Sequence, residues 1–176
     1  MTIDIQQDKD FDAFYDAHQE RVFGFLIWMG IAPNEAEETV NDCFAALFFC
    51  WPDVPAGKRR VYLYRIVTNE AYRRRSFTSQ SSVDFPKAKQ VTLVGDFGRK
   101  EADRVVMHAA LSHLTDRERE AVLLRYYVGC GIEESAMIMD NIEPNSVERY
   151  ASHGHDKLSL ALTADERQDD AGDRSS

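Results

Sequence analysis

The chain lacks the residues and spacings on which several classes of protein depend. Of its 176 residues only three are cysteines, Cys43, Cys50 and Cys130, and no two of them form a Cys-x-x-Cys pair. An odd count without that spacing argues against a disulfide framework and against a cysteine zinc site. We expect all three to be small hydrophobic residues packed inside the protein.

Long hydrophobic stretches are also missing. The longest apolar run, residues 23–32, is much shorter than the roughly 20 residues that a helix needs to cross a bilayer. The N-terminus carries Asp4, Asp8 and Asp10 where a secretory signal peptide would carry positive charge. We therefore expect a cytoplasmic protein without a membrane partner, and its 44% hydrophobic residues are enough to build a core.

The sequence has no pattern typical of an active site. It contains no glycine-rich phosphate loop, no nucleophile elbow and no cluster of metal ligands. His153 and His155 are two residues apart, and such a pair on a helix points its side chains in different directions, which is a poor arrangement for a metal. We therefore expect neither an enzyme nor a bound metal or cofactor.

Positive charge is scarce, with 21 Lys and Arg against 30 Asp and Glu and a net charge of −9. Proteins that bind DNA on their own usually carry an excess of basic residues, which supplies their nonspecific affinity. The basic residues here are concentrated instead, with Arg59, Arg60, Arg65 and residues 73–75 in one short segment. The net charge thus argues against free-standing DNA affinity, but it leaves room for a local DNA-facing patch.

That segment, residues 59–75, alternates aromatic and basic side chains at helical spacing. One face of the predicted helix carries Tyr62, Arg65, Asn69, Tyr72 and Arg73, and the opposite face carries Leu63, Tyr64, Val67 and Ala71. Arginine binds phosphate, tyrosine stacks on unpaired bases, and asparagine pairs with a base edge. The pattern favours a surface for an opened nucleic-acid strand, while a solvated amphipathic helix remains the alternative.

Two helices are predicted before this segment, after a leader of residues 1–10. The first covers about residues 10–29 and ends at Gly30, and the second has Asn34 as N-cap with Glu37 completing a capping box. The inward positions of the second helix are Ala36, Val40, Cys43, Phe44 and Leu47, and its outer face carries Glu37, Glu38, Asn41 and Asp42. This acidic face is either a solvated surface or a docking site for a basic partner. The prolines and the glycine in residues 51–58 predict a loop.

Residues 76–103 are polar and weakly periodic, which predicts a flexible linker to a second domain at residues 104–162. Within this linker, residues 91–94 can pack locally as a short element. Four helices are expected in this domain. The first covers about residues 104–113, the second starts at a capping box formed by Thr115 and Glu118, the third covers about residues 132–139, and the last runs from Pro144 to Leu160. Asp140 and Asn141 predict a turn between the last two helices, which gives helix-turn-helix geometry, although structural bundles also contain such pairs. The acidic residues 163–176 are expected to form a disordered tail.

Both halves together resemble the extracytoplasmic-function (ECF) sigma factors, members of the sigma-70 family of bacterial RNA polymerase. In the first half the resemblance rests on Glu35-Ala-Glu-Glu38, Asn41-Asp42, Phe44, Tyr62-Leu-Tyr-Arg-Ile66 and Asn69. In the second half it rests on Ala110-Leu111, Leu114, Arg119-Glu120, Val122-Leu-Leu-Arg-Tyr-Tyr127, Glu134, Ala136 and Pro144-Asn-Ser-Val147. No single motif is highly specific, but the two occur in the expected order across the expected linker.

The resemblance implies an all-α fold of two small domains, a sigma-two-like helical bundle at residues 11–75 and a sigma-four-like helix-turn-helix at residues 104–162. It implies that core polymerase is bound first and supplies the affinity for promoter DNA that the acidic chain lacks. Sigma-two would dock on the polymerase clamp helices through Glu38, Asn41 and Asp42. It would recognise and open the minus-ten element through residues 51–58 and through Tyr62, Arg65, Asn69, Tyr72, Arg73 and Arg74.

Sigma-four would sit on the polymerase flap, and an anti-sigma factor would be a further partner. It would read the minus-thirty-five element through Asn145, Ser146, Glu148, Arg149, Tyr150 and His153. The chain departs from the family here, because its last helix keeps only Arg149 and Lys157 where several basic residues are usual. Asp140-Asn141 also replaces the usual turn glycine, and Tyr62 replaces a common tryptophan.

Two other classes therefore remain open. One is a sigma-like interaction protein that binds polymerase or an anti-sigma factor without selecting promoters, which the poorly basic last helix favours. The other is an autonomous helix-turn-helix regulator, which tight DNA binding by the purified chain alone would favour.

Overall fold

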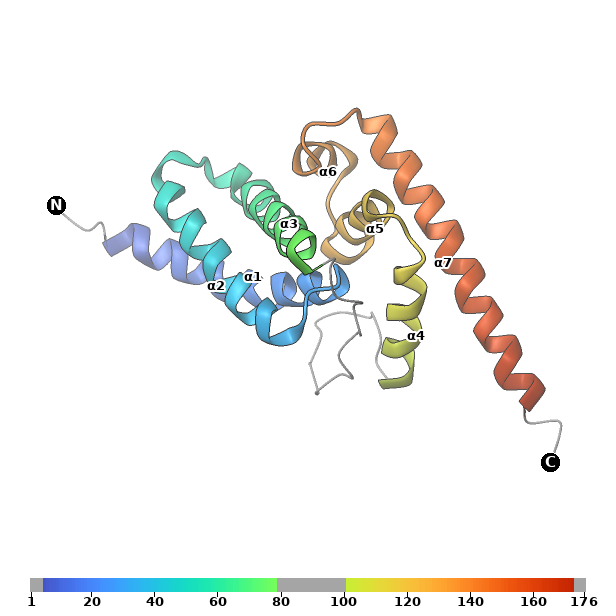
Figure 1. The fold of residues 1–176 in the computed structure, drawn as a ribbon. Coiled ribbons are helices and arrows are strands. Elements are labelled where there is room, and N and C mark those ends of the chain that lie inside the picture. Colours follow the sequence, from blue (N-terminus) through green and yellow to red (C-terminus); the bar gives the residue numbers. More distant parts are fainter. Residues whose placement is uncertain (1–4, 79–100, 173–176) are drawn as a thin grey trace. The chain divides into compact units, whose positions relative to one another are not determined.

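The computed structural model describes residues 5–78 and 101–172, and every regular element in these ranges is a helix (Figure 1). The elements are α1 (Ile5–Trp28), α2 (Pro33–Cys50), the 3-10 turns η1 (Trp51–Asp53) and η2 (Ala56–Lys58), α3 (Arg59–Thr78), α4 (Glu101–Ser112), α5 (Asp116–Val122), the π-helical η3 (Leu123–Val128), α6 (Ile132–Ile138) and α7 (Pro144–Gly172). The predicted all-α class is confirmed. None of the described helices is long and apolar enough to span a membrane.

The helices form two compact units, one built from α1, α2 and α3 and the other from α4, α5, η3, most of α6 and α7. In the first unit α1 and α2 lie side by side and run in opposite directions, and α3 contacts both (Figure 1). Phe25, Leu26, Phe44, Leu47, Leu63, Tyr64 and Val67 are all completely or almost completely buried. The rings of Phe25 on α1 and Tyr64 on α3 meet edge to face at 5.5 Å, a geometry that adds to the stabilisation from burial.

The start of α2 corrects the predicted cap. The helix begins at Pro33 with Ala32 as N-cap, and no side chain caps it. Proline suits the first helical position because it has no N–H to leave unpaired and its φ is already helical. The helix therefore starts two residues before the position that an Asn34 cap would require. Gly30 ends the preceding helix as predicted, with a left-handed φ of 94°.

The predicted loop at residues 51–58 consists of η1 and η2 with Trp51 buried inside the unit. The Trp51 ring contacts Phe11 at 5.0 Å and Phe14 at 5.1 Å, both on α1, and the Arg59 guanidinium lies 3.8 Å from its centroid. These contacts hold the loop against α1 and fix the point at which α3 begins. Pro52, Asp53 and residues 55–58 remain exposed.

In the second unit the Thr115–Glu118 capping box is confirmed. The Thr115 hydroxyl accepts a bond from the Glu118 N–H at 3.3 Å, and Glu118 accepts one from the Thr115 N–H at 2.9 Å. Arg119 is 6% exposed and donates from Nε to the Leu111 carbonyl at 3.1 Å. That bond satisfies a carbonyl group in the last turn of α4, which has no partner within its own helix.

The long helix α7 packs closely along α5. A Cβ at Gly154 would lie 2.6 Å from Val122 Cγ2 and 3.2 Å from the Glu118 carbonyl oxygen, so only glycine fits there without rearrangement. Val147, Ala151 and Leu158 bury the same side of α7. The opposite side of its first turns is thereby left on the surface.

Several predicted boundaries shift. α3 continues to Thr78 and α4 begins at Glu101, so the predicted linker is shorter at both ends, and the predicted short element at residues 91–94 lies outside the described residues. α7 continues to Gly172, through most of the predicted disordered tail, because no proline or glycine interrupts residues 155–171. The turn before α7 is as predicted, with φ of 64° at Asp140 and 56° at Asn141.

The cysteines follow the prediction in part. All three are free, Cys43 and Cys130 are buried, and Cys50 is half-buried. Burial raises the pKa of Cys43 to about 12, so its thiol is neutral and unreactive at physiological pH.

Candidate functional site

The exposed face of α3 carries the side chains that the periodicity placed there. Tyr62 is 48% exposed, Asn69 and Arg73 are exposed, and Arg65 and Tyr72 are half-buried. On the opposite face Leu63, Tyr64, Val67 and Ala71 are completely buried. The helix therefore packs with one side and presents aromatic, amide and cationic groups with the other. Such a surface can stack on bases and bind phosphate.

Arg74 lies elsewhere, on the side of α3 that faces α2. Its guanidinium contacts Glu38 Oε2 at 3.3 Å, Asp42 Oδ2 at 3.0 Å and Glu70 Oε1 at 3.0 Å, and its side chain is 17% exposed. Arg73 also binds Glu70, with Nε 2.8 Å from Oε2. Hydrogen bonds from Arg73 and then Arg74 hold the pKa of Glu70 below its usual value, although partial burial opposes this shift. The five charged groups form a network between α2 and α3.

The acidic face of α2 is exposed as predicted. Glu38 and Asp42 have side chains 68% and 59% exposed, and Asn41 and Glu37 are also on the surface. The Tyr15 hydroxyl of α1 donates to Asn41 Oδ1 at 3.4 Å. The structure therefore brings together the three residues predicted to dock on polymerase.

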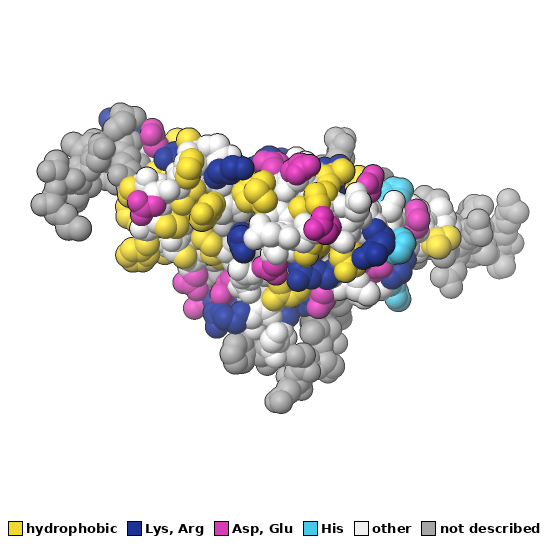
Figure 2. Space-filling model, turned by 90° about the horizontal axis from the view of Figure 1, so that it is seen from above, with side chains coloured by type: hydrophobic (Ala, Val, Ile, Leu, Met, Phe, Trp, Pro, Cys, Tyr) yellow, Lys and Arg dark blue, Asp and Glu magenta, His cyan; other side chains and the backbone are white. Residues whose placement is uncertain are grey.

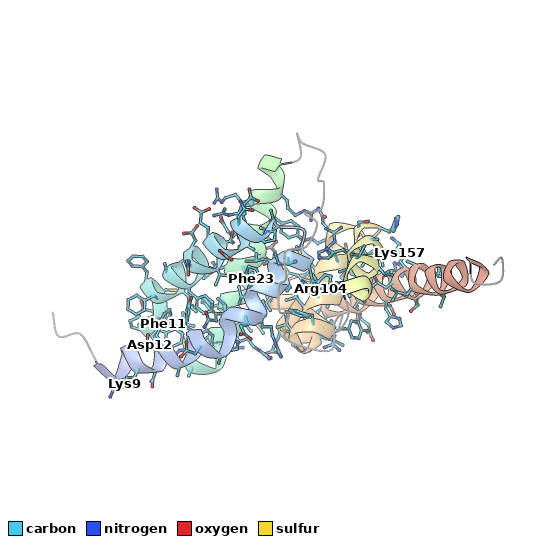
Figure 3. All side chains as sticks on the ribbon, turned by 90° about the horizontal axis from the view of Figure 1, so that it is seen from below. Lys9, Phe11, Asp12, Phe23, Arg104 and Lys157 are labelled. Atoms are coloured by element: carbon cyan, nitrogen blue, oxygen red, sulfur yellow. The ribbon has the colours of Figure 1, made fainter. Side chains whose placement is uncertain are left out.

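Two shallow grooves run between α1 and α2 beside this face. One, of about 390 Å³, is lined by Tyr15, Gln19, Glu20, Phe23, Glu37, Val40 and Asn41. The other, of about 550 Å³, is lined by Phe11, Asp12, Tyr15, Asn41, Phe44, Ala45 and Phe48. Phe11 and Phe23 are labelled in Figure 3. The helical periodicity of each segment carries no signal for a groove that two helices line together.

The start of α7 presents the six residues predicted to read DNA. Asn145, Glu148, Arg149 and His153 are exposed, and Ser146 and Tyr150 are half-buried. The Arg149 guanidinium lies 5.4 Å from the Tyr150 ring centroid. Helix α6, the turn at Asp140 and Asn141, and α7 follow one another as a helix-turn-helix requires.

Lys157 is engaged within its own unit. Its ammonium donates to Glu118 Oε2 at 2.7 Å and to Oε1 at 2.9 Å, and it is labelled on α7 in Figure 3. Glu118 is 8% exposed; burial alone would raise its pKa, but hydrogen bonds from Lys157 and Thr115 lower it overall. Of the two basic residues between Pro144 and Leu160, Arg149 is exposed at the start of the helix and Lys157 stabilises its packing. Figure 2 shows Lys and Arg side chains interspersed with Asp and Glu on the face in view.

No three His, Cys, Asp or Glu side chains gather as a metal site within residues 5–78 and 101–172. His155 Nδ1 lies 3.8 Å from Asp156 Oδ1, and the His155 ring packs against Tyr126 at 5.9 Å.

Comparison with known proteins gives two family matches. The model described as sigma-70 region 2 matches residues 14–79, and the model described as sigma-70, region 4 matches residues 104–158. No curated protein sequence matches the chain significantly.

Two solved structures are similar over most of the chain. One is CnrH in complex with the cytosolic domain of CnrY, with 21% identity, a TM-score of 0.67, and 90% of each chain covered. The other is the sigma factor RpoE of Bartonella quintana in complex with the anti-sigma factor NepR, with 23% identity and a TM-score of 0.70, covering 89% of this chain and 99% of that one. At these identities the likeness concerns the fold.

We predict that Lys157→Met destabilises the fold in a pH-dependent way. Loss of a charged hydrogen bond to a buried carboxylate should lower the free energy of unfolding at neutral pH by on the order of 1 kcal/mol. Because the folded-state pKa of Glu118 is lowered, this contribution is complete above the ordinary pKa of 4.5 and is lost as pH falls through the folded value. Denaturant unfolding between about pH 7 and pH 3 measures the difference.

Arg149→Met is the matched control, because it removes an exposed cation from the same helix. It should change stability by no more than about 0.5 kcal/mol at either pH. If Lys157→Met is as mild as this control at neutral pH, the ion pair does not stabilise the unit.

Proposed function

Because the chain belongs to the sigma-70 family, as an ECF sigma factor with region 2 at residues 14–79 and region 4 at residues 104–158, we propose how its two units select a promoter. The protein is a sigma factor, and it acts on transcription by binding. The observation that carries the detailed proposal is the two-sided α3, which buries one face and presents tyrosine, asparagine and arginine on the other. Transcription in vitro with purified core polymerase, on the protein's own upstream region, tests the proposal as a whole.

The first step is docking of Glu38, Asn41 and Asp42 on the clamp helices of core polymerase in the cytoplasm. These residues share the outer side of α2, and their side chains are on the surface. Carboxylates at a protein interface favour a basic partner and steer its approach. The second unit then sits on the polymerase flap.

The second step is capture of the opened minus-ten strand by the exposed face of α3 and the exposed residues of the 51–58 loop. Stacking of a base on an aromatic side chain contributes about 1–3 kcal/mol. Tyr62 is the exposed aromatic of this face, Asn69 offers a base-edge contact, and Arg65 and Arg73 offer phosphate contacts. Tyr72 is half-buried beside them.

Contacts of α7 with the minus-thirty-five element complete the complex. The N–H groups of its first turn favour a phosphate oxygen, and Asn145, Ser146, Arg149, Tyr150 and His153 surround them. With Lys157 held by Glu118, few counterions are released on binding, so the isolated unit should bind DNA weakly. Tethering through polymerase raises the effective concentration of this helix at the promoter without any new contact.

An anti-sigma factor is a further proposed partner. The complexes of CnrH with CnrY and of RpoE with NepR support this proposal through the shared fold. A second candidate function is a sigma-like protein that binds polymerase or an anti-sigma factor without reading the minus-thirty-five element. The exposed Glu148 and the engaged Lys157 favour this alternative.

We predict that Glu38→Gln with Asp42→Asn weakens binding to core polymerase. Loss of two charges from a docking face should lower the affinity about tenfold and reduce its salt dependence. Titration of labelled protein with core measures this affinity. Glu133→Gln with Asp156→Asn removes two exposed acids from the other unit and is the control; equal affinities for both pairs would contradict the assignment.

We predict that Tyr62→Ala with Asn69→Ala abolishes promoter opening while leaving core binding intact. The variant loses a stacking surface and a base-edge contact that act only on the separated strand. Permanganate footprinting of the holoenzyme reports opened thymines. Ser76→Ala changes another exposed residue of α3 and should open promoters normally, whereas opening by the double variant would make this face structural.

We predict that Glu148→Lys tightens promoter binding by holoenzyme and makes it less selective. The substitution replaces repulsion of phosphate by attraction, and it removes a carboxylate that can accept a hydrogen bond from a cytosine amino group. Competition between promoters with and without the minus-thirty-five element measures both effects. No change in either quantity would mean that α7 does not meet DNA and would favour the sigma-like interaction protein.

A further inference from the structure

Three carboxylates from two helices converge on one arginine in the first unit. Glu38 and Asp42 are one turn apart on α2, and Glu70 is one turn before Arg74 on α3. Like charges four residues apart repel one another on a helix surface. Arg74 lies among the three acids and offsets this repulsion.

The two α2 acids are held from one side only. Glu38 contacts Arg74 through Oε2 and Asp42 through Oδ2, and both side chains remain more than half exposed. Arg74 itself is 17% exposed and is fixed further by Glu70, which also binds Arg73. The half-buried cation therefore restricts the conformations of two surface carboxylates without covering them.

We propose that Arg74 is a positioning residue for polymerase docking, which fixes Glu38 and Asp42 in the conformation that the basic partner surface binds. The inference rests on the proposed docking face. It also gives Arg74 a different role from the minus-ten contact that the sequence indicated, because the guanidinium is directed toward α2 and away from Tyr62 and Asn69. Two side chains that are already ordered lose less conformational freedom on binding.

The proposal makes a prediction opposite to that of simple electrostatics. If Arg74 only neutralised the acids, its removal would leave a more negative surface, and a basic partner would bind more tightly. If Arg74 positions them, its removal lets both carboxylates move and repel one another, and core polymerase binds more weakly. The direction of the change therefore separates the two roles.

The test compares Arg74→Gln with Arg73→Gln in the full-length chain. Arg73 is the neighbouring arginine, also binds Glu70, and has a side chain 57% exposed, which makes it a matched control. We expect Arg74→Gln to weaken core binding about tenfold, and Arg73→Gln to leave it within about twofold. With saturating core, the Arg74→Gln holoenzyme should open promoters normally in permanganate footprinting, while Arg73→Gln should impair opening.

A double-mutant cycle shows whether Arg74 acts through the two acids. In a chain that already carries Glu38→Gln and Asp42→Asn, Arg74→Gln should change core affinity by less than about twofold. Arg74→Lys keeps the charge without the planar fork and should recover part of the affinity. If thermal unfolding shows that Arg74→Gln does not fold, Arg74→Lys is compared with Arg73→Gln in its place.

Three results would overturn the inference: unchanged or tighter core binding by Arg74→Gln, the same loss in both backgrounds, or failure of promoter opening at saturating core. Failure of the proposed docking face has a different signature. In that case Glu38→Gln with Asp42→Asn would itself bind core polymerase normally.

Discussion

The pairing of basic side chains with partners inside each unit limits what this acidic chain can offer to DNA. Arg74 is held by three carboxylates, Lys157 by Glu118, and Arg119 by a backbone carbonyl. Each of these bonds stabilises a junction between helices and removes a cation from the set available for phosphate. The cations on the predicted DNA-facing surfaces are Lys58, Arg65, Arg73 and Arg149, of which Arg73 also binds Glu70, and they are few beside a net charge of −9. DNA binding must therefore draw its affinity from a larger assembly, as it does for a sigma factor bound to polymerase.

The elements that depend on local chemistry could be predicted from the sequence. The alternation along residues 59–75 defined the buried and exposed faces of α3, because the helical period of 3.6 residues fixes which side chains share a face. The Thr115–Glu118 capping box and the left-handed Asp140 and Asn141 also depend only on neighbouring residues. The start of α2 was predicted wrongly because two local signals differ. Asn34 favours an N-cap and Pro33 favours the first helical position, and the helix begins at Pro33.

The pairs that join separate helices could not be predicted in this way. Arg74 lies 36 residues from Glu38, and Lys157 lies 39 residues from Glu118. Periodicity places each residue on a helix face but does not say which face of another helix it meets, and many acids would have been equally suitable partners. Gly154 had the same ambiguity, since its close contact with Val122 depends on the path of α7 along α5. The resemblance implied only that Arg74 and Lys157 are basic residues near DNA, whereas the structure pairs them with acids of their own units.

The two promoter elements differ in how the protein can fix their positions. Glu38 and Asp42 on α2 and Tyr62 and Asn69 on α3 belong to one unit, whose helices share a buried core and the Arg74 network. A partner bound at α2 is therefore placed relative to the exposed face of α3 by packing alone, to within side-chain motion. The proposed DNA-facing start of α7 belongs to the other unit. In the proposed complex both units dock on polymerase, so the polymerase surface would set the spacing between the two elements and take part in recognition as well as supply affinity.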